Sequence, residues 1–309
     1  CVHYKGPHHF YEYPERHAKL LEGVTIPEPP TLHEDVEQTS PRLKAVLPQQ
    51  MNRNKSYYDR HKNETEPRMT RADDSRGQAS AAYQHMLHKY IRCVAAIDDN
   101  LQRLFDYLDS EHITDDTLIV YTSDQGYWLG QHGLYDKRLI LDESLKMPLI
   151  VRYPKLVKPG TVNRDLCSNV DFAPTLLEFA GVDIPAAMQG RSLWPLLRGE
   201  TPTDWRQAVW YAYWGAPPNH WGIRTADATL VRFPGTDEFE FYDLKIDPLQ
   251  KRSAHADPAY AERIARLNEV LTSTMREVEI QPSELPGTAK QGRATTKPRT
   301  KSRQKVSVK

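Results

Sequence analysis

The sequence lacks any long apolar run, and no stretch of its 309 residues approaches the ~20 residues that a membrane-spanning helix requires. Cysteine is scarce, and three residues are too few for a disulfide framework in a chain of this length. Their odd number leaves the redox compartment open. What remains is a chain long enough to bury a substantial core, as one large domain or two.

The formal net charge is zero, but the charge is unevenly distributed. Residues 290–309 contain eight Lys or Arg and no acidic residue, which leaves 33 basic against 41 acidic residues elsewhere. This basic segment has few apolar residues, so we expect it to be a disordered tail. Such a tail can bind nucleic acid or an acidic surface. An unstructured terminus is the simpler interpretation, and we do not expect nucleic acid as a partner.

The first half of the chain predicts helices and strands in alternation. Residues 14–78 are rich in Pro and charge and predict long irregular connections. Apolar residues then recur at steps of three and four from Ala79 to Leu108, which predicts a helix. Asp98 and Asp99 fall between the members of this stripe, so we expect them to be solvated or capping rather than metal-binding.

Two strands and a second helix are expected next. One strand precedes Asp124, and Met147 to Tyr153 form another. Asp171 is expected to cap a helix that starts near Pro174 and ends by Gly181. This alternation predicts an α/β fold with a sheet packed between helices.

After Arg206 the pattern changes to short strands separated by Pro and Gly turns, followed by one amphipathic helix from about Tyr260 to Met275. We therefore expect a catalytic α/β domain over 1–205, a small antiparallel α+β subdomain over 206–280, and the basic disordered tail over 281–309. The predicted strands of the subdomain are Ala208–Tyr213, Trp221–Thr225, Thr229–Phe233 and Phe239–Asp243.

The most informative segment is 117–137. A short apolar run leads into Asp124, Gln125 and a glycine, and His132 and Lys137 follow. Ligands of open α/β sheets gather at the carboxyl ends of strands, and two oxygen donors there suit a hard divalent cation. The His and the Lys suit an anion beside that cation. The alternative is an ordinary turn, because Asp and Gly both favour turns.

This segment resembles the sulfatase family of the alkaline-phosphatase-like superfamily, whose pattern is a strand, Asp with Asn or Gln, Gly, then Gly-x-His-Gly and a Lys. Further matches follow in the family's order over roughly residues 1 to 280, which argues against chance. They are Lys5-Gly-Pro-His8, Glu143–Arg152, Asp171–Leu177, Gly190–Leu193, Gly222–Thr225 and Phe241–Pro248.

The resemblance implies an alkaline-phosphatase-like α/β fold and a sulfuric ester hydrolase. It implies that Asp124 and Gln125 are metal ligands, with Ca²⁺ favoured over Mg²⁺. Lys137 and His8 would be catalytic, the first binding the sulfate and the second binding it and acting as general acid. Three residues are weaker candidates for substrate binding: Lys5, His132, which is equally well explained as holding the loop, and His220.

The family's nucleophile, a formylglycine made from Cys or Ser in a Cys/Ser-x-Pro/Ala-x-Arg segment, has no match here. Cys1, Cys93 and Cys167 lie in other contexts, and the family's opening strand that ends in Asp-Asp also has no match. The chain begins at Cys1 without Met or a signal peptide. We therefore expect it to be the C-terminal portion of a longer sulfatase-like protein, inactive alone, with the formylglycine upstream.

Two alternatives stay open: a phosphonate or phosphodiester hydrolase of the same superfamily, and a non-catalytic sulfatase-like binding protein. Gln125 favours the sulfatase, because the phosphonate and phosphodiester hydrolases tend to carry His after this Asp. Aromatic residues between Tyr211 and Trp221 favour a sulfated carbohydrate as substrate. Family habit implies a periplasmic or secreted location.

Overall fold

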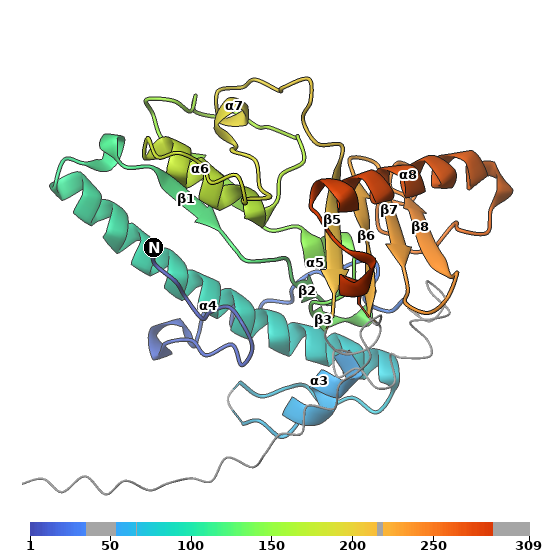
Figure 1. Cartoon of the computed structure of the whole chain (residues 1–309). Coiled ribbons are helices and arrows are strands. Elements are labelled where there is room, and N and C mark those ends of the chain that lie inside the picture. Colours follow the sequence, from blue (N-terminus) through green and yellow to red (C-terminus); the bar gives the residue numbers. More distant parts are fainter. Residues whose placement is uncertain (35–53, 66, 215–218, 287–309) are drawn as a thin grey trace, which may run out of the picture.

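The computed structural model describes residues 1–34, 54–65, 67–214 and 219–286. Within these ranges it combines helices with three small antiparallel sheets (Figure 1). The predicted mixture of helices and strands, with a small antiparallel sheet near the C-terminus, is confirmed. The domain boundaries stay predictions, and most of the expected tail, 287–309, lies outside the described residues. No helix of the described ranges is both long and apolar enough to cross a bilayer.

The longest element is α4, Ser75–Ser110, which confirms and extends the predicted helix. Its start is capped by Asp74, whose carboxylate accepts a hydrogen bond from the Gly77 amide at 2.8 Å. Near its other end, Asp99 accepts from Arg16 Nε at 2.8 Å on the surface. Asp98 and Asp99 are both exposed to solvent, as expected.

Against α4 packs a shorter helix, α3, Asn54–His61. The expectation of irregular connections throughout 14–78 was wrong here. Tyr57 and Tyr58 are buried against α4, so tertiary packing stabilises a helix whose sequence has no apolar stripe of its own.

Two strands lie between the helices. Strand β1, Ile119–Thr122, pairs antiparallel with β4, Leu149–Arg152, and confirms both predicted strands. Figure 1 shows β1 between α4 and α6, Phe172–Phe179, as expected for a sheet packed between helices.

Asp171 occupies the N-cap position of α6, as predicted, but its side chain makes no capping hydrogen bond to the helix. Its carboxylate is fully buried and accepts hydrogen bonds from the Ser168 amide at 2.7 Å and the Arg191 amide at 2.8 Å. It also forms an ion pair with Arg206. A buried carboxylate needs such a partner, so the Asp171 side chain joins the loops around α6 instead of capping the helix.

The C-terminal sheet has the antiparallel order β5-β6-β7-β8. Helix α8, Ala261–Glu277, covers one face with Ile264, Leu267 and Leu271. All four predicted strands and the predicted helix are confirmed. The strands are Ala208–Tyr213, His220–Thr225, Ala228–Arg232 and Phe239–Asp243.

The remaining elements are short. The hairpin of β2, Trp128–Leu129, and β3, Tyr135–Asp136, is followed by the single helical turn α5, Asp142–Leu145. Helix α7 is Trp194–Leu197. The 3-10 turns are Glu15–His17, Thr114–Asp116, Gln131–Gly133, Asn169–Asp171, Pro258–Tyr260 and Pro282–Glu284.

Candidate active site

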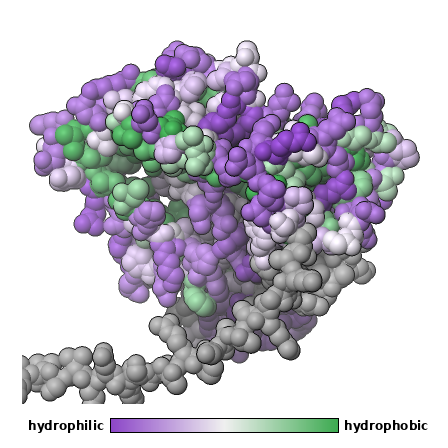
Figure 2. Space-filling model, in the orientation of Figure 1, coloured by the Kyte–Doolittle hydropathy of each residue, from purple (hydrophilic) through white to green (hydrophobic). Residues whose placement is uncertain are grey.

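A large cavity of about 1760 Å³ opens among the N-terminal segment, α4, β1 and α6. Lys5, His8, Asp124, Gln125 and Lys137 all line it. Apolar residues of α4, β1 and α6 also line it. Figure 2 shows the corresponding apolar surface on the side where Figure 1 draws α6 and β1. The structure thus gathers five of the seven predicted site residues in one cavity.

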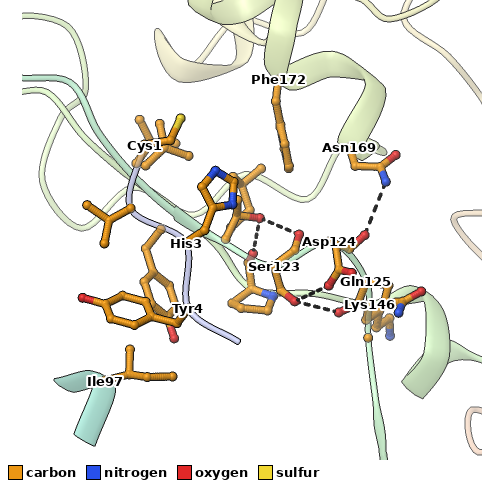
Figure 3. A pocket seen from close by; sticks show the side chains of 18 of the residues that line it. Cys1, His3, Tyr4, Ile97, Ser123, Asp124, Gln125, Lys146, Asn169 and Phe172 are labelled. Atoms are coloured by element: carbon orange, nitrogen blue, oxygen red, sulfur yellow. Dashed lines mark hydrogen bonds between the residues drawn. The ribbon is translucent and has the colours of Figure 1, made fainter. Parts of the chain in front are cut away.

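Asp124 and Gln125 follow β1 after one intervening residue, Ser123, and both are exposed in the cavity (Figure 3). The Ser123 hydroxyl lies 3.2 Å from Asp124 Oδ1 and 3.0 Å from the Gln125 carbonyl. From the turn before α6, Asn169 Nδ2 donates to the Asp124 carbonyl at 3.3 Å. These contacts leave the Gln125 amide and most of the Asp124 carboxylate open to a ligand.

A close backbone contact sets the path of this loop. The Gly126 amide donates to the Ser144 carbonyl of α5 at 3.0 Å. A Cβ on Gly126 would lie 2.1 Å from the Glu143 carbonyl oxygen and 2.5 Å from that of Lys146. Glycine is therefore required here, because any side chain would push the Asp124–Gln125 loop away from α5.

His8 and Lys137 meet across the cavity, with Lys137 Nζ 2.8 Å from His8 Nε2. The second ring nitrogen of His8, Nδ1, lies 2.9 Å from the His9 carbonyl and donates to it. Because an ammonium can only donate, His8 Nε2 accepts in this arrangement. Lys137 also contacts Asp136 Oδ1 at 2.9 Å and lies 5.8 Å from the centre of the Tyr127 ring.

His132 was predicted as a substrate-binding residue or as a residue that holds the loop, and its burial favours the second role. It is 1% exposed and is absent from the described lining of the cavity. Its Nδ1 lies 3.0 Å from Glu34 Oε2, and its Nε2 lies 3.8 Å from Glu143 Oε2. Burial lowers the pKa of His132 to about 4, so the ring is neutral at pH 7.

His220 does not reach the cavity, contrary to the prediction for it. It begins β6, is 1% exposed, and packs among the rings of Tyr211, Tyr213 and Phe233. A substrate in the cavity would have no access to this imidazole without opening the C-terminal sheet.

Asp124 and Gln125 supply oxygen donors, the type that Ca²⁺ and Mg²⁺ prefer. Their position at a strand end, open to the cavity, fits part of such a site. A calcium shell takes roughly six to eight ligands. The described ranges contain no group of three or more His, Cys, Asp or Glu that could hold a metal. The pair thus fits a divalent cation as a partial shell only.

Sequence reasoning also missed polar residues of the cavity wall, among them Glu143, Lys146 and Asn169. Burial raises the pKa of the Glu143 carboxyl above its ordinary value. Glu143 and Lys146 stand within a segment already matched by motif, so a signal for them existed. Asn169 had none, because its distance of 45 residues from Asp124 is closed only by the fold.

The family models that match this chain agree with the known proteins that resemble it. The family model "Sulfatase" matches residues 1–182, and the model "N-sulphoglucosamine sulphohydrolase, C-terminal" matches residues 130–277. An N-acetylglucosamine-6-O-sulfatase of Bacteroides thetaiotaomicron is 37% identical over 89% of this chain and 57% of its own length. The human N-acetylglucosamine-6-sulfatase is 39% identical over 40% of this chain and 23% of its own.

Two solved structures are also similar to this chain. A protein in complex with its substrate D-glucosamine-2-N,6-O-disulfate has a TM-score of 0.79 and 32% identity, over 91% of this chain and 65% of that one. A phosphonate monoester hydrolase from Silicibacter pomeroyi has a TM-score of 0.67 and 26% identity, over 85% of this chain and 53% of that one. The chain thus spans less than two thirds of these relatives. Because the sulfatase model matches more than half of its residues, the chain belongs to the sulfatase family.

Proposed function

We propose that the protein is a sulfuric ester hydrolase and that the polar side chains lining the cavity bind the sulfate group. The observation that carries the proposal is the meeting of His8 with Lys137 in the cavity that also exposes Asp124 and Gln125. A cation site, a fixed ammonium and an imidazole in one cavity supply what a sulfate ester requires. Its oxygens need positive charge, and its leaving alcohol needs a proton.

Each group has a role in this proposal. Asp124 and Gln125 hold Ca²⁺, with Mg²⁺ as the alternative, and the cation would neutralise charge on the sulfate oxygens. Lys137 binds a sulfate oxygen as a compact positive charge. His8 binds the sulfate and, once protonated at Nε2, gives that proton to the leaving oxygen. Lys5, in the same wall, contributes further positive charge.

The nucleophile is assigned to a formylglycine outside residues 1–309. None of Cys1, Cys93 and Cys167 lies in the family's nucleophile segment. Cys93 is also buried in the core, and burial raises its pKa to about 11, which opposes formation of the reactive thiolate. Activity is therefore expected of the full-length protein and not of this chain alone.

For the substrate we propose a 6-O-sulfated glucosamine unit of a glycan, met in the periplasm or outside the cell. Relatives named as N-acetylglucosamine-6-sulfatases and a neighbour solved with D-glucosamine-2-N,6-O-disulfate support this choice. The phosphonate hydrolase among the structural neighbours keeps that activity as the second candidate. Gln125 argues against it, because a neutral oxygen donor favours a hard cation more than an imidazole would.

The test is hydrolysis by the full-length protein. Glucosamine 6-sulfate, 4-nitrophenyl sulfate and the matching phenyl phosphonate and phosphate are compared by kcat/KM, with and without a chelator. We expect the highest value for the sulfated sugar and loss of activity with the chelator. A preference for the phosphonate would establish the second candidate. Tight binding of the sulfated sugar with no turnover of any ester would indicate a binding protein.

A further inference from the structure

The loop that carries Asp124 and Gln125 rests on a helical turn that is too short to be stable alone. Gly126 donates its amide to the Ser144 carbonyl of α5, and α5 has only four residues. An isolated turn of this length does not repay the cost of nucleation. The position of the loop therefore depends on whatever holds α5.

Two contacts hold α5 at its first residue, Asp142, and the first comes from strand β6 of the C-terminal sheet. Arg224 binds the Asp142 carboxylate with two hydrogen bonds, from Nε to Oδ1 at 2.7 Å and from Nη2 to Oδ2 at 3.0 Å. The Gln250 side chain accepts from the Asp142 amide at 2.7 Å and donates to Thr229 Oγ1 at 3.1 Å. Arg224 and Thr229 face each other in the β6–β7 register, so Arg224 binds Asp142 directly, and Gln250, which follows β8, links Asp142 to the neighbouring Thr229.

The ion pair is largely shielded from water, which strengthens it. The side chains of Asp142 and Arg224 are 12% and 15% exposed. Burial favours the neutral carboxyl, but the hydrogen bonds from Arg224 and Lys146 outweigh it, and the pKa of Asp142 is lowered. A planar guanidinium that makes two hydrogen bonds also fixes the orientation of the carboxylate, whereas an ammonium does not.

We propose that Arg224 is a positioning residue for the Asp124–Gln125 loop, acting through Asp142, α5 and the Gly126 amide. The contact joins the C-terminal sheet to the end of β1, and Figure 1 shows α5 between these two parts. The sheet would then have a role in the cavity without placing any of its own side chains on the substrate. The cation-binding part of this inference rests on the proposed function, whereas the positioning of the loop does not.

Arg224→Met tests the inference, and Arg263→Met is the matched control. Arg263 is likewise paired with carboxylates, Asp227 at 3.1 Å and Asp243 at 2.5 Å, and it lies on α8 away from α5. Both variants lose a partly buried guanidinium and should lose similar stability. We expect only Arg224→Met to speed hydrogen exchange at the Gly126 amide, by about tenfold or more.

A second readout is Ca²⁺ affinity by calorimetry, which should fall about tenfold in Arg224→Met and stay at the wild-type value in Arg263→Met. Arg224→Lys should recover part of both effects. If Arg224→Met does not fold, Arg224→Lys and Asp142→Asn give the same readouts with less loss of volume.

The outcomes separate the two hypotheses. Unchanged Gly126 exchange in Arg224→Met, or equal changes in both variants, would overturn the positioning role. A wild-type protein that binds no Ca²⁺ and hydrolyses no ester, but whose Gly126 exchange responds to Arg224 alone, would remove the proposed function and leave the positioning role intact.

Discussion

Lys137 Nζ lies 2.8 Å from His8 Nε2, although 129 residues separate them in the chain. The contact places an ammonium beside an imidazole ring. In this arrangement the ammonium occupies the nitrogen that would have to deliver the proton. We infer that an anion entering the cavity separates the pair, taking one hydrogen bond from each.

Lys137→Ala should reduce kcat/KM for sulfate ester hydrolysis by the full-length protein by about 100-fold or more, because a positioned charge on the reacting group is lost. Lys155→Ala is the control, since Lys155 pairs with Asp116 on the surface and lies outside the described cavity lining. Steady-state kinetics of both variants decide the matter. Wild-type kinetics in Lys137→Ala would remove this residue from the site.

Gln125→Ala should weaken Ca²⁺ binding by at least about tenfold, because even indirect partners of a metal site contribute that much. Gln125→His should shift preference away from Ca²⁺ towards ions that accept nitrogen ligands, such as Mn²⁺ or Zn²⁺. Calorimetric titrations measure both effects. Gln102→Ala, on the exposed face of α4, is the control. Equal Ca²⁺ affinity in all three variants would contradict a ligand role for Gln125.

Gly126→Ala should displace the Asp124–Gln125 loop, because the new Cβ would lie 2.1 Å from a backbone oxygen of α5. We expect a loss of unfolding free energy of about 3 kcal/mol, at the upper end for overpacking, together with loss of Ca²⁺ binding. Gly181→Ala provides the comparison, since Gly181 has φ +68° and no heavy atom near its Cβ position. It should cost about 1–2 kcal/mol in left-handed strain and leave binding unchanged.

His85 should make the protein less stable as the pH falls below about 6.5. It is buried between α3 and α4, with Tyr57 OH at 3.0 Å, and it lies near Glu64 and Lys89. Burial lowers its folded pKa to about 4, so the unfolded chain takes up the proton first. The contribution of His85 to the free energy of unfolding is fully present above pH 6.5. It is lost progressively as the pH falls towards 4, by up to about 1.4 kcal/mol per pH unit.

Chemical unfolding of wild type and His85→Gln between pH 7.5 and 4.5 measures this loss, with wild type expected to show the steeper decline. His112→Asn, at an exposed position, should keep the wild-type slope. Identical slopes in wild type and His85→Gln would contradict a buried neutral imidazole at this position.

The local elements could be predicted because each is specified by residues close together in the chain. The apolar stripe of α4 and the four short strands from β5 to β8 have the periods of a helix and of half-buried strands. The residues of the proposed site could be predicted only because they stand in ordered motifs. Composition and spacing alone left Asp124-Gln125-Gly126 as either a metal site or a turn.

The periodicity of the sequence could not predict contacts between distant segments. Helix α3 has no apolar stripe and forms because Tyr57 and Tyr58 find a surface on α4. Asp is a residue type that favours helix caps, yet the buried carboxylate of Asp171 pairs with the guanidinium of Arg206 instead.

The sequence by itself determined the helices, the strands and the chemical types available to the site, since these depend on neighbouring residues. Tertiary structure alone decided which of them meet. It brings His8 into contact with Lys137, and it buries His132 and His220 away from the cavity. It also linked Arg224 to Asp142. Such contacts depend on how whole elements pack, and burial then determines which charges can remain unpaired.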